Sequence, residues 1–166
     1  MNTAHERIPA YDPPPQLQTV SNTLPLEYLR ISLPQSVLTP QQLTELAGMI
    51  RRYSPRHALR LRSATQLEIA MAFPHLPSPP EQVFNTPEIT VKTRDHEAAG
   101  HSTLRVHVRG AQLYVRQLRV LAALMYTEGL RTVRVADSET LQIENVWRGR
   151  EAVLRLGLRE AGLVTI

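Results

Sequence analysis

The sequence predicts an α+β domain that follows an extended arm, and two observations lead to this prediction. Two stretches of the chain each show the order strand, helix, strand, and they match each other in register. Residues 1–27 show no helical or alternating period and contain five prolines, which favour extended backbone. Two β-α-β units bury their helices most economically on one face of a single antiparallel sheet, the ferredoxin-like arrangement. We therefore expect residues 28–166 to form one ferredoxin-like domain.

The arm, residues 1–27, lacks the pattern that would let it build a core of its own. It is either a disordered tail or an extended strap across a partner or across this domain. The anchors predicted for a strap are four apolar side chains, Ile8, Tyr11, Leu17 and Val20.

The first unit is expected over residues 28–73. Apolar and polar residues alternate at 28–33, which predicts a strand with one buried face. Thr39 is a suitable N-cap, and Pro40 suits the first position of a helix. An apolar stripe at helical spacing follows, and we expect the helix to end near Ser54.

Two extended segments follow that helix, at 58–61 and 67–71, around a polar corner at 62–65. The whole pattern then recurs over residues 104–166. A shift of 75 residues superposes the first strand and the helix, and a shift of 74 superposes the later segments. Agreement of three elements in one register predicts an internal repeat.

Residues 74–103 between the repeats are expected to be a proline-rich connector that ends in a hairpin. The hairpin would pair a strand at 89–93 with the strand at 104–108. A closing helix is expected at 150–161, with Gly162 as its cap. The sheet face without helices is left open, so it needs a cover: the arm, the connector, a second subunit or a ligand.

The composition excludes several classes of protein. The chain has no cysteine, which excludes disulfides, thiolate metal sites and cysteine nucleophiles. No apolar run is long enough to cross a bilayer and the N-terminus has no signal pattern, so we expect a cytoplasmic protein that does not insert into membranes. Only Lys92 is a lysine among 19 basic residues, and residues 104–166 hold all of the net charge of +4. The arginines suit an anionic partner, although a GC-rich genome would produce the same bias.

Five arginines are the predicted anion- or partner-binding residues. Alternation with the apolar residues of each strand points four of them onto the open sheet face, and the fifth lies in the corner that follows. They could meet phosphates, tetrapyrrole carboxylates or an acidic partner. The alternative is a solvated face whose arginines pair with Glu68, Glu144 and the acids of the arm. The five are Arg30, Arg60, Arg62, Arg105 and Arg134.

No residue set predicts catalysis or a metal site. The run from His96 to His101 resembles a zinc motif, but its histidines are five residues apart with Gly100 between them, whereas zinc chemistry on a helix needs a spacing of four. No glycine-rich phosphate loop is present, and no histidine is placed to form a catalytic triad. We therefore predict no catalytic residue, no metal and no cofactor.

Several runs carry a family resemblance. They are YLRISLP at 28–34, LTPQQL at 38–43 and QLEI at 66–69 in the first copy, with IENV at 143–146 and EAGL at 160–163 in the second. These runs resemble the ferredoxin-like half domains of nitrite and sulfite reductases, over roughly 28–72 and 104–163. The resemblance implies that two half domains combine into a single structural domain.

The departures from that family limit what the resemblance implies about function. The family has an arginine in a Thr-x-Arg-Gln corner that helps to hold the siroheme carboxylates. This chain has Ala64 at that position, and Ser138 in the second copy. The catalytic half with its four cluster cysteines is missing, so the chain is not a complete reductase.

The function expected from these features is that of a non-catalytic accessory or structural subunit. It would bind a protein partner, or further copies of itself, through the open sheet face and the arm. One alternative is an anion or tetrapyrrole binder, as in siroheme handling, that uses Arg60, Arg62 and Arg134. A second is nucleic-acid binding, the less expected because only Tyr28 is placed to stack on a base.

Overall fold

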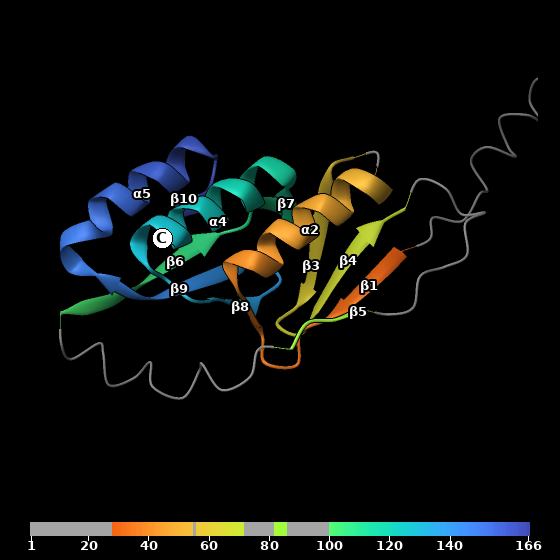
Figure 1. Cartoon of the computed structure of the whole chain (residues 1–166), viewed down its shortest axis with the longest axis horizontal. Coiled ribbons are helices and arrows are strands. Elements are labelled where there is room, and N and C mark those ends of the chain that lie inside the picture. The colour runs from red at the N-terminus through yellow and green to blue at the C-terminus, as the bar shows by residue number, and fades with distance from the viewer. Residues whose placement is uncertain (1–27, 55, 72–81, 86–99) are drawn as a thin grey trace, which may run out of the picture.

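The structure, a computed structural model, describes residues 28–54, 56–71, 82–85 and 100–166. These residues form three helices and two five-stranded sheets, so the predicted α+β class is confirmed (Figure 1). The predicted strap anchors Ile8, Tyr11, Leu17 and Val20 lie outside the described residues, as does the hairpin strand expected at 89–93.

Each sheet is built mainly from one repeat. In the first sheet the strand order is β5 (Gln82–Val83), β1 (Tyr28–Ser32), β4 (Gln66–Ala70), β3 (Ala58–Ser63) and β7 (Gln112–Tyr114). In the second it is β10 (Val164–Thr165), β6 (His101–His107), β9 (Thr140–Trp147), β8 (Val133–Asp137) and β2 (Val37–Leu38).

The prediction of one antiparallel sheet is wrong, because the repeats exchange short strands. The segment before the helix of each repeat pairs with the outer hairpin strand of the other repeat. Thus β2 pairs with β8, with Val37 opposite Arg134, and β7 pairs with β3, with Gln112 opposite Arg60. These exchanged strands occupy the edges at which β3 and β8 would have joined. Strands β3 and β8 contact each other, but they do not pair by backbone hydrogen bonds, so the two sheets stay separate.

Three helices cover one side of the two sheets (Figure 1): α2 (Pro40–Tyr53), α4 (Val115–Glu128) and α5 (Glu151–Glu160). The predicted N-cap of α2 is confirmed: Gln42 N donates to Thr39 Oγ1 (3.1 Å), and Thr39 N donates to Gln42 Oε1 (2.9 Å). At the matching place in α4, Tyr114 N donates to Gln117 Oε1 (3.0 Å). The closing helix is also confirmed, and α2 packs on α4 and α4 on α5.

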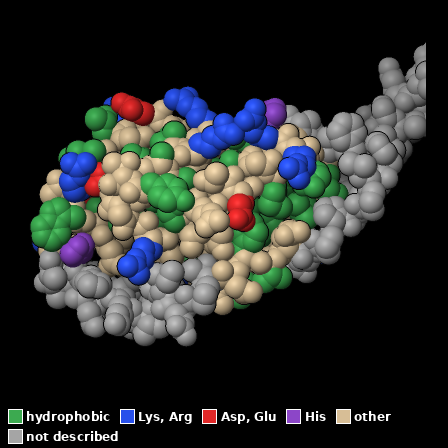
Figure 2. All heavy atoms as spheres, in the orientation of Figure 1, with side chains coloured by type: hydrophobic (Ala, Val, Ile, Leu, Met, Phe, Trp, Pro, Cys, Tyr) green, Lys and Arg blue, Asp and Glu red, His purple; other side chains and the backbone are tan. Residues whose placement is uncertain are grey.

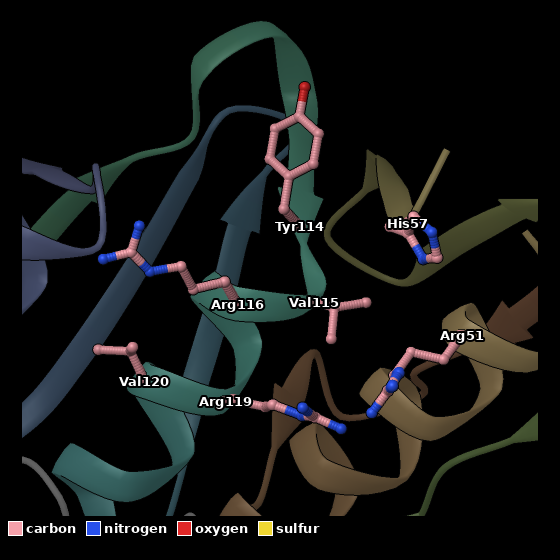
Figure 3. A pocket seen from close by; sticks show the side chains of 7 residues that line it. All are labelled: Arg51, His57, Tyr114, Val115, Arg116, Arg119 and Val120. Carbon is pink, nitrogen blue, oxygen red and sulfur yellow. The ribbon is translucent and has the colours of Figure 1, made fainter. Parts of the chain in front are cut away.

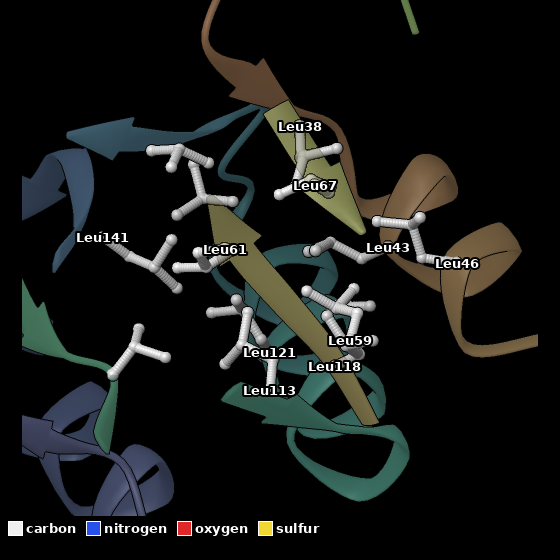
Figure 4. Packing of buried hydrophobic residues seen from close by; sticks show 14 of the residues in the cluster. Leu38, Leu43, Leu46, Leu59, Leu61, Leu67, Leu113, Leu118, Leu121 and Leu141 are labelled. Atoms are coloured by element: carbon white, nitrogen blue, oxygen red, sulfur yellow. The ribbon is translucent and has the colours of Figure 1, made fainter. Parts of the chain in front are cut away.

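One core joins the two repeats. Figure 4 shows Leu113, Leu118 and Leu121 of the second repeat beside Leu59 and Leu61 of β3, and all five are buried. The exchanged strands therefore bring apolar side chains of each repeat into the sheet of the other. Burial of this common apolar surface is the main force that holds the two sheets together.

The connector contains a strand that the sequence did not predict. Residues 82–83 form β5, which pairs in parallel with β1, and Phe84 is buried in the core beside it. The prolines around these residues favoured a loop, and two residues are too few to show alternation. Strand β6 begins at His101, three residues before the expected start.

Candidate functional site

The five predicted arginines lie on strands β1, β3, β6 and β8, at positions that alternate with buried residues. In the first sheet Arg30 and Arg60 are both opposite Glu68 in the strand register. In the second sheet Arg105 and Arg134 are both opposite Gln142. Each sheet therefore carries a row of two arginines with one polar residue between them, on the face away from the helices.

The first of these rows surrounds a buried carboxylate. Glu68 is only 8% exposed, with Oε1 at 3.4 Å from Arg62 Nε and 4.0 Å from Arg30 Nε. Arg60 lies directly opposite on β3 and is exposed. Among the described residues, three arginines around one carboxylate give this face a net positive charge.

Arginines of the second sheet are more fully compensated by acids. Arg134 Nε donates to Glu144 Oε1 at 3.0 Å. A hydrogen bond from the backbone of Glu139 lowers the pKa of Asp137, and the nearby charge of Arg105 contributes in the same direction. The pairing with Glu68 and Glu144 that we considered as the alternative is present, but it neutralises the second sheet more than the first.

A row of small and aromatic residues lies beside the arginines of the first sheet. Tyr28 is opposite Ala70, and Ala58 is opposite Tyr114, while the register of β3 with β4 places the two alanines next to each other. Tyr28 is 45% exposed and Tyr114 is 47% exposed. The first sheet thus has two exposed tyrosines with two alanines between them. We call this row and the neighbouring Arg30–Glu68–Arg60 row the tyrosine–arginine face.

The sequence analysis missed Tyr114 because β7 has only three residues and runs directly into α4. The available signal was the pair Gln112 and Tyr114, which alternates with buried Leu113. Three residues are too few to distinguish a strand from the start of a helix.

The corners that match the siroheme-binding corner of nitrite and sulfite reductases do not carry an arginine at the family's position in this chain. Ala64 and Ser138 occupy turns that close the β3–β4 and β8–β9 hairpins, and neither side chain carries a charge. Arg62, the nearest arginine, is engaged by Glu68 at 3.4 Å. These residues do not fit a siroheme carboxylate as the family arginine would.

His101 of the suspected zinc motif lies against an aromatic ring. Its centroid is 5.1 Å from that of Trp147, and the two rings meet edge to face. His96 and Glu97 lie outside the described residues. Within the described ranges, no three histidine or acidic side chains are grouped so that they could hold a metal. Nor does any described helix have the length and apolar character to span a bilayer.

A second basic surface lies on the helix side of the molecule, and the sequence analysis did not predict it. Figure 2 shows arginine side chains gathered there beside a histidine. An open hollow of about 450 Å³ lies between the end of α2, the residue before β3 and the start of α4. Four basic side chains and three others line it (Figure 3): Arg51, His57, Arg116 and Arg119, with Tyr114, Val115 and Val120.

The sequence shows the arginines of this hollow, but it does not show that they lie close together. Arg51 is in the last turn of α2, where a cation favours the helix dipole, whereas Arg116 and Arg119 are near the start of α4, where it does not. Only the packing of α2 against α4 shows that these arginines share one space.

No protein-family model, curated protein or solved structure matches this chain.

Proposed function

We propose that this chain is a non-catalytic accessory or structural subunit that binds an acidic protein partner through its tyrosine–arginine face. The observation that carries the proposal is the placement of Tyr28 and Tyr114 on one sheet face with Arg30 and Arg60. Tyrosine and arginine are the residue types, with tryptophan, that most often dominate the binding energy of protein interfaces.

The charge of this face supports an acidic partner. In the described part of the chain Arg30, Arg60 and Arg62 surround one carboxylate, that of Glu68, so a partner with surface carboxylates would be attracted and oriented by the excess charge. The same excess argues against a symmetric dimer through this face, because a two-fold contact would place arginines opposite arginines.

We further propose that the two repeats derive from the paired half domains of nitrite and sulfite reductases. The support is the equivalence of the repeats in detail. Leu33 N donates to Thr65 O (2.8 Å), and Val108 N donates to Glu139 O (2.7 Å) at the matching place. The exchanged strands and both helix starts also match at the same sequence offsets.

Affinity purification of the full-length chain from its native cells tests the proposed function. The wild type is compared with Arg30→Ser/Arg60→Ser and with its matched control, Arg105→Ser/Arg134→Ser, which removes the same charge from equivalent positions of the second sheet. We expect an acidic partner in stoichiometric amount with the wild type and the control, and its loss with the first variant. An equal loss with both variants, or no accompanying protein with the wild type, would contradict the proposal.

Nucleic acid is a second candidate, because Tyr114 adds a second exposed aromatic to the arginine-bearing face. The absorption spectrum of the same eluate separates the alternatives. Nucleic acid gives absorption at about 260 nm that nuclease removes, and its binding weakens steeply with salt. A bound tetrapyrrole gives an intense visible band. We expect neither.

A further inference from the structure

The hollow between α2 and α4 gathers two guanidinium groups and an imidazole without a neighbouring acid. Arg51, His57 and Arg119 line it, and within the described ranges no carboxylate lies within 4.0 Å of any of them. All three residues are exposed. On the sheet side, by contrast, Arg30 and Arg62 share the carboxylate of Glu68.

The side chains converge from separate elements. Figure 3 shows Arg51 and Arg119 pointing toward each other below Val115, with the imidazole of His57 on the side of Arg51. Arg116 points away from them and donates to the carbonyl oxygen of Glu160 (3.3 Å). Two guanidinium groups and one imidazole therefore face the same space.

The backbone fixes this arrangement. Val115 N, at the start of α4, donates to His57 O (3.0 Å), which ties the residue before β3 to the first turn of α4. His57 has a φ of 54°, a conformation that non-glycine residues rarely adopt. The backbone of His57 is thus held by a contact between the two repeats.

The arrangement of charges at the hollow favours an anion. Arg51 and Arg119 repel each other, and Arg119 is near the positive end of the α4 dipole. A bound anion would reverse both effects. The apolar side chain of Val115 borders the space between the two guanidinium groups, whereas Val120 lines the hollow on the side of Arg116 (Figure 3).

We propose that this hollow binds a small organic phosphate, with the phosphoryl group between Arg51 and Arg119 and the organic part on Val115. Each guanidinium fork can donate two parallel hydrogen bonds to a pair of oxygen atoms. Because Arg51 and Arg119 approach from different sides, the anion that suits both has oxygen pairs that point in more than one direction. A tetrahedral phosphate presents them, whereas a planar carboxylate presents one pair. His57 supplies a further donor from the β3 side.

This site is separate from the tyrosine–arginine face and does not rest on the proposed function. The ring of Tyr114 points away from Arg51 and Arg119 in Figure 3, although the residue borders the hollow. Phosphate binding and partner binding can therefore fail independently.

Isothermal titration of the full-length chain at constant ionic strength tests the site. The probes are phenyl phosphate, inorganic phosphate and benzoate. The variant is Arg51→Gln/Arg119→Gln, and its matched control is Arg131→Gln/Arg148→Gln, which removes two exposed arginines outside the hollow.

We expect phenyl phosphate to bind the wild type and the control with one-to-one stoichiometry, and the variant at least about tenfold more weakly because both forks are lost. Equal weakening in the control, or no binding to the wild type, would overturn the site. If inorganic phosphate binds as tightly as phenyl phosphate, the claim that the site contacts the organic part of the ligand is wrong. If benzoate binds as tightly as phenyl phosphate, the claim that the site prefers a phosphate is wrong.

A measurement on the wild type alone does not depend on how the variants fold. On titration with phenyl phosphate, amide NMR shifts should change around His57 and over the first turns of α4, from Val115 to Val120. Changes centred on the sheet face instead would contradict the proposed location.

Discussion

Tyr28 and Ala70 stand next to each other on the open face of the first sheet, whereas the matching positions of the second sheet hold Thr103 and Glu144. Glu144 binds Arg134 at 3.0 Å, so at these positions the second sheet has no aromatic residue and its arginine is neutralised. The repeats agree in how they are built and differ in what they present to solvent.

The agreement extends to strained backbone. Ser36 and Ala111, at equivalent positions before the exchanged strands, have φ values of 59° and 60°. Neither residue is glycine, so both turns adopt an unfavourable conformation that the surrounding contacts maintain. Features present in both repeats are those that the fold requires. Features of one repeat only, such as the tyrosine–arginine face, are where we place a function.

We expect the largest loss of stability from substitutions in the exchanged strands, a feature that both repeats share. Leu38 of β2 and Leu113 of β7 are both buried in the sheet of the other repeat. We expect Leu38→Ala and Leu113→Ala each to lower the free energy of unfolding by about 2–5 kcal/mol, the usual cost of emptying a core position. Urea unfolding provides the measurement, and Val83→Ala, at an exposed position of β5, is a control with little expected effect.

The same experiment tests whether the repeats unfold together. Trp147, the only tryptophan, reports on the second sheet, while far-ultraviolet circular dichroism reports on both sheets. The two probes should give coincident transitions in the wild type and in both variants. A shift of the circular dichroism transition by Leu113→Ala, with the Trp147 transition unchanged, would show that the two sheets unfold independently.

A smaller effect concerns α5, in the second repeat. Arg150, just before α5, donates two hydrogen bonds to Glu128 at the end of α4 (2.9 and 3.0 Å). These bonds lower the pKa of Glu128 below its ordinary value of 4.5, so the pair stabilises the fold above that pH and is lost as pH falls through the lowered pKa.

We therefore expect Glu128→Gln to be less stable than the wild type by about 0.5–1 kcal/mol at pH 7. The difference should close in acid, because the wild-type carboxyl becomes neutral as well. Chemical unfolding of both proteins across this pH range measures the gap. A gap that stays constant between neutral and acidic pH would show that the charge of Glu128 is not its source.

Local signals in the sequence were enough to predict the helices and the long strands. Thr39 and Pro40 marked a helix start because capping depends on a few neighbouring residues. Gly162, with a φ of 84°, marked the end of the closing helix for the same reason. The α+β class follows from these elements.

The sheet arrangement could not be predicted in the same way. Strands β2 and β7 have two and three residues, and their partners belong to the other repeat, so neither alternation nor sequence proximity reveals them. The tyrosine–arginine face was predicted only in part, since Tyr28 and the arginines were predicted on it but Tyr114 was not. The basic hollow could not be predicted from the sequence, because its arginines belong to two helices whose exposed faces each resemble an ordinary solvated surface.

Hydroxyl-radical footprinting of the chain, free and with its co-purified partner, tests the central claim most directly. Four exposed aromatic residues serve as internal probes: Tyr28 and Tyr114 on the proposed face, and Tyr126 and Trp147 elsewhere. We predict that the partner protects Tyr28 and Tyr114 from oxidation and leaves Tyr126 and Trp147 as reactive as in the free chain. Protection of Tyr126 and Trp147, with Tyr28 and Tyr114 still reactive, would contradict the assignment of the first sheet as the binding face.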